Sequence, residues 1–217
     1  MFTGIVARTC SVVGFNDSSP TLDLRIRLGS LCDELVDGSS VSVNGVCLTV
    51  TECNNGEAKF DVVPATASLT NLSQCKLGSE VNIERSLKFG SEIGGHVLSG
   101  HVCETVLVSE ASNTLQGSTI VFKASDEWKR FLFSKGFIAL NGVSLTLAEF
   151  DRETGVGRVN LIPETMERTN LGRTKAGDTL NLEIDSQTQS IVETTESFLR
   201  ENPSWLRTIL ENQVTAA

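Results

Sequence analysis

The sequence predicts an all-β protein made of two homologous barrels and a helical tail. Three observations lead to this prediction: an internal repeat, short β-branched runs broken by Asn-Gly turns, and a change of pattern after residue 185. The 217 residues suit one large domain or two small ones. The 40% of hydrophobic and 21% of charged residues exclude a disordered chain, a collagen and a coiled-coil rod.

The repeat sets the organisation of the chain. Four pairs of segments match in the same order at an offset of 96 to 99 residues: 4–6 with 100–102, 44–50 with 141–147, 70–72 with 169–171, and 76–84 with 175–183. Ordered matches at a nearly constant offset indicate two copies of one unit. We therefore expect a first domain over residues 1–97, a second over 98–185 and a tail over 186–217.

Each half has the pattern of short antiparallel strands. In the first half, β-branched runs at 41–43, 47–51 and 59–63 are separated by Asn-Gly turns. Asn44-Gly45 and its counterpart Asn141-Gly142 predict tight hairpins, because both turn positions need a positive φ. Strands at this spacing predict a small closed barrel in each half, with a pair of small sandwiches as the alternative.

The tail has a helical pattern. Ser186 to Gln189 fits a capping box, and Ile191, Val192, Phe198 and Leu199 follow as an apolar stripe. Pro203 ends this helix, and a second helical pattern runs from Ser204 through Trp205, Leu206, Ile209 and Leu210. The stripe must be buried either on the chain's own barrels or on other subunits, and we favour self-association.

Charge and cysteine usage narrow the class of partner. A net charge of -9 argues against nucleic acid, and no apolar run approaches the roughly 20 residues of a membrane helix. Residues 1–6 lack the features of a secretory signal, so we expect a cytoplasmic protein with six reduced thiols. Cys and His do not cluster at zinc-ligand spacing. A small molecule or another copy of the chain is the expected partner.

The differences between the halves point to chemistry. Cys47 corresponds to Ser144, and His101 corresponds to Ile5, so two related pockets would carry unlike polar groups. His96 and His101 are five residues apart, which puts them on opposite faces of an extended segment. Histidine exchanges protons near neutral pH. We expect His101 to be the proton-handling group and His96 to be structural, whereas Cys47 is either a nucleophile or a small buried side chain.

Several long motifs resemble the riboflavin synthase family: Met1–Val6, Asn44–Val50, Ile93–Val102, Lys135–Phe137, Gly142–Thr146 and Leu161–Thr165. The resemblance covers almost the whole chain. It implies two six-stranded Greek-key barrels, each binding 6,7-dimethyl-8-ribityllumazine, and a four-carbon transfer between two lumazines that needs no metal or cofactor. It further implies a homotrimer held by the tail helix, a site between the barrels of neighbouring subunits, and lumazine synthase as a candidate protein partner.

The resemblance also implies the site residues. Catalytic roles fall to His101, Cys47, Ser40 and Phe2. The first pocket would contain Gly4, Ile5, Val6, Cys47, Leu48 and Thr49, with Asp61, Val62, Val63 and Thr66 on one strand. The second would contain Gly100, His101, Val102, Lys135, Ser144, Leu145, Thr146, Ile162, Pro163, Glu164, Thr165 and Asp185.

The chain departs from the family pattern at three positions. Ala65 and Ser68 lack the charged side chains that are usual in the first half, and Asn141 stands where Asp is common. All three bear on ligand binding. A non-catalytic lumazine- or flavin-binding protein of the same fold is the alternative function, against which the presence of Cys47, both histidines and the tail argues.

Overall fold

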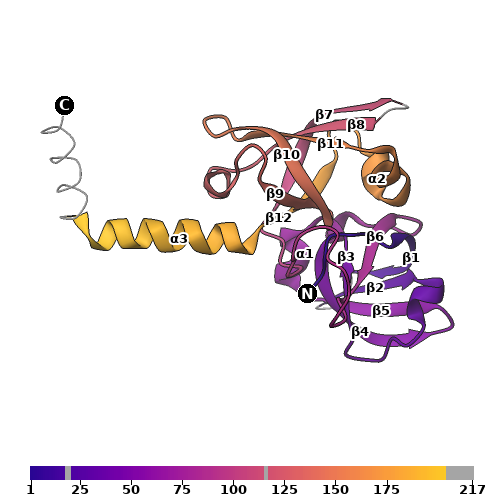
Figure 1. Cartoon of the computed structure of the whole chain (residues 1–217). Coiled ribbons are helices and arrows are strands. Elements are labelled where there is room, and N and C mark those ends of the chain that lie inside the picture. The colour runs from indigo at the N-terminus through magenta and orange to yellow at the C-terminus, as the bar shows by residue number, and fades with distance from the viewer. Residues whose placement is uncertain (18–20, 115–116, 204–217) are drawn as a thin grey trace, which may run out of the picture. The chain divides into compact units, whose positions relative to one another are not determined.

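The computed structural model describes residues 1–17, 21–114 and 117–203 and contains two closed antiparallel barrels of six strands each (Figure 1). The first is built from β1 (Arg8–Asn16), β2 (Leu22–Arg27), β3 (Ser40–Val43), β4 (Val46–Asn54), β5 (Glu57–Val62) and β6 (Glu80–Arg85). The second is built from β7 (Glu104–Thr114), β8 (Gly117–Lys123), β9 (Phe137–Leu140), β10 (Val143–Asp151), β11 (Val156–Leu161) and β12 (Thr179–Ile184).

Both barrels have the same Greek-key strand order. The first closes as β1-β2-β5-β4-β3-β6, and the second as β7-β8-β11-β10-β9-β12. In each, three consecutive strands form hairpins and the next strand returns beside the first of them, as a Greek key requires. The predicted all-β class, the duplication and the closed barrels are confirmed, and the sandwich alternative is wrong.

The predicted hairpin turns explain how β3 meets β4 and how β9 meets β10. Asn44 and Gly45 have φ values of +47° and +82°, and Asn141 and Gly142 have values of +46° and +75°. Two successive positive φ values fit a type I′ turn, whose twist matches that of the flanking strands. The register follows directly, with Val43 opposite Val46 in the first barrel.

Apolar side chains fill the first barrel. Along β2, Leu22, Leu24 and Ile26 are buried, whereas the residues between them are more exposed. Phe60 of β5 and Ile83 of β6 complete this core with no exposed surface. Because these side chains occupy the interior, polar residues of the same strands project outward.

Short helices interrupt the strand order. These are α1 (Pro64–Leu69), α2 (Pro163–Arg168), and the 3₁₀ turns η1 (Gly29–Cys32), η2 (Asn71–Gln74), η3 (Lys129–Phe131) and η4 (Asn170–Arg173). The prediction that Thr66 continues the strand of Asp61 is wrong, because β5 ends at Val62 and Thr66 lies in α1. Pro64 is the reason: proline cannot donate to a strand ladder but suits the first turn of a helix.

The tail forms α3 (Ser186–Glu201), which begins at the predicted capping residue and ends before Pro203. Residues 1–185 form one compact unit, and the tail forms another. Among the described side chains of α3 none is buried, and Ile191 and Phe198 of the predicted stripe are exposed. The second helical pattern, from Ser204 to Leu210, lies outside the described residues. No helix in the described part of the chain is long and apolar enough to cross a membrane.

A ring of asparagine side chains joins the two barrels. Its four members donate in turn around a closed cycle: Asn44 to Asn71 (3.3 Å), Asn71 to Asn141 (2.9 Å), Asn141 to Asn170 (3.3 Å) and Asn170 to Asn44 (2.9 Å). Asn82 and Asn181 brace the ring from either side, each donating its amide to a backbone oxygen of the opposite half. Every member has a counterpart in the other half, so the ring is two-fold symmetric.

The junction also explains the departure at Asn141. Its Oδ1 accepts hydrogen bonds from Asn71 and from the backbone of Asn181, while its Nδ2 donates to Asn170. Asn141 is 3% exposed. An aspartate could not make the donated bond, so the amide belongs to the junction between barrels.

We therefore predict that Asn141→Asp destabilises the fold by about 2–3 kcal/mol, because it sets two acceptors against each other and buries a charge. Urea unfolding measures the loss. The matched control is Asn160→Asp, since Asn160 is exposed and its Oδ1 only accepts, from the Thr119 hydroxyl. The control should change stability by less than about 0.5 kcal/mol. Equal losses in the two variants would contradict the role of the ring.

Candidate active site on the outer faces of the barrels

The segments that lead into the two barrels are paired with each other. Phe2 and Leu98 exchange two backbone hydrogen bonds, of 2.8 and 3.0 Å. Each segment then continues onto the opposite half of the chain. The Ser144 amide donates to the Gly4 carbonyl, and the Cys47 amide donates to the Gly100 carbonyl, both at 2.9 Å.

This exchange corrects the predicted grouping of the pockets. Sequence analysis put Gly4 with Cys47 and Gly100 with Ser144, each within its own half. The structure instead places Gly4 against Ser144 and Gly100 against Cys47. Val102, from the second half, accordingly packs against the core of the first barrel.

Glycine is required at both crossings. Gly4 and Gly100 have φ values of +73° and +80°, which side-chain-bearing residues rarely adopt. A Cβ at Gly4 would lie 2.5 Å from the Cβ of Ser144, and one at Gly100 would lie 2.5 Å from the Cβ of Cys47. The weak match between residues 4–6 and 100–102 thus marks two equivalent close approaches.

A buried glutamate fixes each crossing segment. Glu84 of β6 accepts hydrogen bonds from the Thr3 amide and hydroxyl, both at 2.7 Å, and from the Gly4 amide at 3.0 Å. Glu183 of β12 accepts the equivalent three from Ser99 and Gly100, all at its Oε1 atom. Burial raises the pKa of both carboxyl groups, against the opposing effect of these hydrogen bonds. Sequence analysis missed both glutamates, although they align with each other in the repeat.

The first group of site residues surrounds Cys47. This side chain is half-buried and packs against Phe2, Leu98 and Ala139. Thr49 follows Cys47 by two residues on β4, so the two side chains share the outer face of the barrel. Ser40 of β3 stands opposite Thr49. His101 is exposed beside Gly100, and its amide donates to the Ser99 hydroxyl at 3.2 Å.

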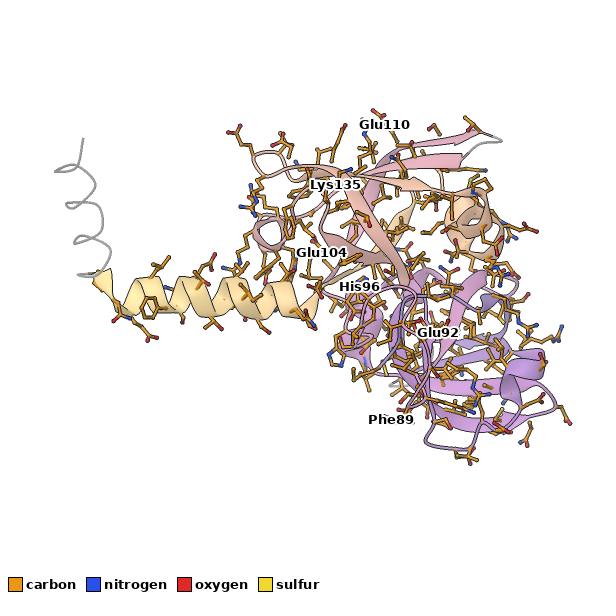
Figure 2. All side chains as sticks on the ribbon, viewed as in Figure 1. Phe89, Glu92, His96, Glu104, Glu110 and Lys135 are labelled. Atoms are coloured by element: carbon orange, nitrogen blue, oxygen red, sulfur yellow. The ribbon has the colours of Figure 1, made fainter. Side chains whose placement is uncertain are left out.

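The second group surrounds Ser144. The Nδ1 atom of His96, labelled in Figure 2, lies 2.7 Å from the Ser144 hydroxyl, and its ring stacks on Phe137 with centroids 5.2 Å apart. Phe137 stands opposite Thr146 in the register of β9 and β10. His96, which sequence analysis expected to be structural, therefore contacts a residue of the predicted site.

His96 is electrostatically unusual. It is 7% exposed, and within the described residues its Nε2 atom has no hydrogen-bond partner. Burial lowers its pKa, while the nearby Asp185 carboxylate acts in the opposite direction. The neutral ring is thus favoured, and its Nδ1 atom can orient the Ser144 hydroxyl.

The predicted residues divide into two sets by burial. Buried are Phe2, Gly4, Val6, Leu48, Val62, Gly100 and Leu145. Exposed or half-buried are Ile5, Ser40, Cys47, Thr49, Asp61, Val63, Thr66, His101, Val102, Lys135, Ser144, Thr146, Ile162, Pro163, Glu164, Thr165 and Asp185. Because Leu48 and Val62 face the barrel core, only their backbones can contact a ligand on the outer face.

Charged members of the set occupy separate elements. Lys135, labelled in Figure 2, is exposed in the turn before β9 and has a φ of +70°. Asp61 lies 3.8 Å from the Nζ atom of Lys59. Glu164 pairs with Arg168 one helical turn along α2. These three charged side chains thus lie in the turn before β9, on β5 and in α2.

A cavity of about 520 Å³ lies elsewhere, beside the asparagine ring. Its lining includes Asn71, Glu80, Arg173 and Asp178. None of its lining residues belongs to the predicted site. In the described part of the chain, no three His, Cys, Asp or Glu side chains are placed to hold a metal ion.

The family model of the lumazine binding domain matches this chain twice, over residues 3–86 and 99–185. The riboflavin synthase of Escherichia coli (strain K12) is 43% identical to this chain over 209 residues. The match covers 93% of this chain and 96% of the E. coli protein. This chain belongs to the riboflavin synthase family.

Other relatives agree with this membership in the riboflavin synthase family. The riboflavin synthase of Chlamydia pneumoniae is 42% identical over 200 residues, covering 92% of this chain and 97% of its own length. Among solved structures, LumP complexed with riboflavin has a TM-score of 0.79 at 24% identity, covering 86% of this chain and all of LumP. LumP therefore has the same fold.

We predict that Glu84→Gln destabilises this riboflavin synthase family member by about 1–3 kcal/mol more than Glu183→Gln does. Both oxygens of Glu84 accept, so a glutamine amide would oppose one N–H donor. At Glu183, Oε1 makes all three bonds and the buried Oε2 has no partner among the described residues, so glutamine can keep them. Denaturant unfolding of both variants at neutral pH measures the difference.

The pH dependence provides a second measurement. Because the folded pKa of Glu183 is raised, the folded state binds more protons than the unfolded state above about pH 4. The stabilising effect of the neutral acid is present at low pH and is lost as pH rises through the folded pKa. Wild type should lose stability relative to Glu183→Gln over that range, and a constant difference would show that the carboxyl is not strained by burial.

Proposed function

We propose that this chain is a riboflavin synthase. It converts two molecules of 6,7-dimethyl-8-ribityllumazine into riboflavin and 5-amino-6-ribitylamino-pyrimidinedione by transferring a four-carbon unit, without a metal or redox cofactor. The observation that carries this proposal is the 43% identity to a riboflavin synthase across 93% of the chain. The two unlike groups around Cys47 and Ser144 support it, since one compound must serve as both donor and acceptor.

The proposed roles follow the geometry of the two groups. His101 moves the proton, because it is exposed and, among the described residues, makes no ring stack like the one that holds His96. Cys47 and Ser40 assist as polar or nucleophilic side chains, and Phe2 shapes the apolar floor beneath Cys47. The main contribution is to hold two rings in a reactive orientation, which is worth several orders of magnitude in rate. The other predicted site residues bind the lumazines.

A homotrimer would complete this site. Cys47 is half-buried and Thr49, His101 and Thr146 are exposed, so a single chain leaves its reacting groups open to water. A neighbouring subunit would cover them and bring a first barrel against a second. The exposed apolar side chains of α3 supply a surface for this association. We also propose barrel boundaries at residues 1–97 and 98–185, a cytoplasmic location, and lumazine synthase as a candidate partner.

Incubation with 6,7-dimethyl-8-ribityllumazine alone should produce riboflavin, which absorbance and fluorescence detect as the substrate is consumed. The product ratio should be one riboflavin for every two lumazines, because the reaction is a dismutation. Binding of the lumazine without turnover would sink the proposed activity and support the non-catalytic lumazine- or flavin-binding protein instead.

The histidines serve as a matched pair in this assay. His101→Gln should lower kcat by roughly 10²-fold or more, as expected for loss of proton transfer. His96→Gln should lower it less, because the amide can still hydrogen-bond the Ser144 hydroxyl. Equal losses would remove the assignment of the proton to His101.

Removal of residues 186–217 should leave folded barrels that are monomeric and have little activity. The barrels form one compact unit without the tail, so their strand content should survive. Light scattering gives the mass, circular dichroism the fold, and riboflavin formation the activity. A truncated monomer with full activity would contradict the intersubunit site.

A further inference from the structure

Asn-Gly turns occur at three places in the described chain, and all three have the same backbone conformation. The turns Asn44-Gly45 and Asn141-Gly142 have positive φ values at both residues. Asn55-Gly56, which joins β4 to β5, has φ values of +52° and +76°. In this dipeptide the glycine nitrogen can attack the asparagine side chain, because glycine has no side chain to hinder the approach. The three turns therefore differ mainly in what surrounds the asparagine.

The asparagine ring holds the side-chain amide in two of these turns. Asn44 and Asn141 are 4% and 3% exposed. The Nδ2 atom of Asn44 donates to Asn71, and that of Asn141 donates to Asn170, both at 3.3 Å. The Oδ1 atom of each also accepts two hydrogen bonds. Attack by the glycine nitrogen at either turn would first require the asparagine ring to open.

The asparagine of the third turn has no such restraint. Asn55 is exposed, and within the described part of the chain its side chain has no hydrogen-bond partner. Among the same residues, the Gly56 amide, which carries the attacking nitrogen, donates to no acceptor. A two-residue turn at the surface opens locally at a low cost in free energy. The side chain and the nitrogen can therefore reach the geometry of attack without disturbing the barrel.

We propose that Asn55 is a site of spontaneous deamidation, and that the asparagine ring protects Asn44 and Asn141 from the same reaction. The Gly56 nitrogen attacks the side-chain carbonyl carbon of Asn55 and forms a C–N bond. The side-chain NH₂ group takes the proton of the Gly56 amide and leaves as ammonia, which gives a five-membered succinimide. Water then opens the succinimide at one of its two carbonyl groups, so that either aspartate or isoaspartate results.

Both products alter the β4–β5 turn. Each adds a negative charge near Glu57 in the chain, whose carboxylate pairs with Arg27 at 3.1 Å. Isoaspartate also lengthens the main chain by one carbon, which no longer fits a two-residue turn with Asn54 opposite Glu57. The hydrogen bond from the Gly29 amide to the Gly56 carbonyl, which holds η1 against this turn at 2.8 Å, lies on the altered segment. The isoaspartyl form should therefore melt about 2–4 °C below the unmodified protein.

The test incubates the folded full-length protein at alkaline pH, where hydroxide assists removal of the Gly56 proton, beside a matched sample at mildly acidic pH. Digestion with trypsin and a glutamate-specific protease gives peptides 53–57, 35–52 and 136–149, which carry Asn55, Asn44 and Asn141 respectively. Mass spectrometry detects each conversion of amide to acid, and fragment ions separate Asn55 from Asn54. Conversion of Asn55 should be faster at alkaline pH and roughly 10-fold or more ahead of the other two, because the asparagine ring must open before they react.

Unfolded protein and a variant provide the controls. In guanidinium chloride the asparagine ring is absent, so all three peptides should convert at similar rates. Asn55→Gly keeps a residue that accepts a positive φ but has no side-chain amide, so incubation should produce neither the modified 53–57 peptide nor the melting shift. Equal conversion of the three peptides in the folded protein, or an intact Asn55 after the same time in which the unfolded chain has reacted, would overturn the proposal.

Discussion

The asparagine ring at the junction is the interaction on which the rest of the structure depends. Four amides, three of them buried and that of Asn170 half-buried, donate and accept in a closed cycle, and Asn82 and Asn181 connect that cycle to the backbone of the opposite half. Buried polar groups are costly unless all are satisfied, so the ring tolerates one arrangement of the barrels. Gly45 and Gly142 allow that arrangement, since a Cβ at either would lie within 2.7 Å of the other's backbone.

With the barrels so fixed, the two site groups become equivalent in backbone and unlike in side chain. Each group is built from an equivalent glutamate, an equivalent crossing glycine and an equivalent hairpin strand. The two groups differ in their side chains, with a thiol at Cys47 in one and a hydroxyl at Ser144 in the other. A symmetric scaffold is thus able to present one compound in two chemical environments, which a dismutation requires.

Much of this structure could be predicted from local sequence patterns, whereas the contacts between distant residues could not. The hairpins follow from two-residue turns, and the duplication from the repeat, so the fold class and strand pattern could be derived. The exchange of leading segments could not, because Gly4 meets Ser144 across 140 residues. His96 was expected to be structural, but its contact with Ser144 could not be derived for the same reason, as the two residues are 48 positions apart. Glu84 and Glu183 read as ordinary strand residues until their hydrogen bonds are seen.

The filled barrel interior explains why the proposed site lies outside the barrels. Leu24, Ile26 and Phe60 occupy the volume that a wider barrel could offer to a ligand. The outer faces of β4 and β10 remain, and there the strand period places Cys47 with Thr49, and Ser144 with Thr146, on one side. An outer face cannot exclude water by itself, which weakens every electrostatic contact made there. The proposed site would therefore need a second protein surface, which links the proposed assembly to the proposed catalysis through one packing constraint.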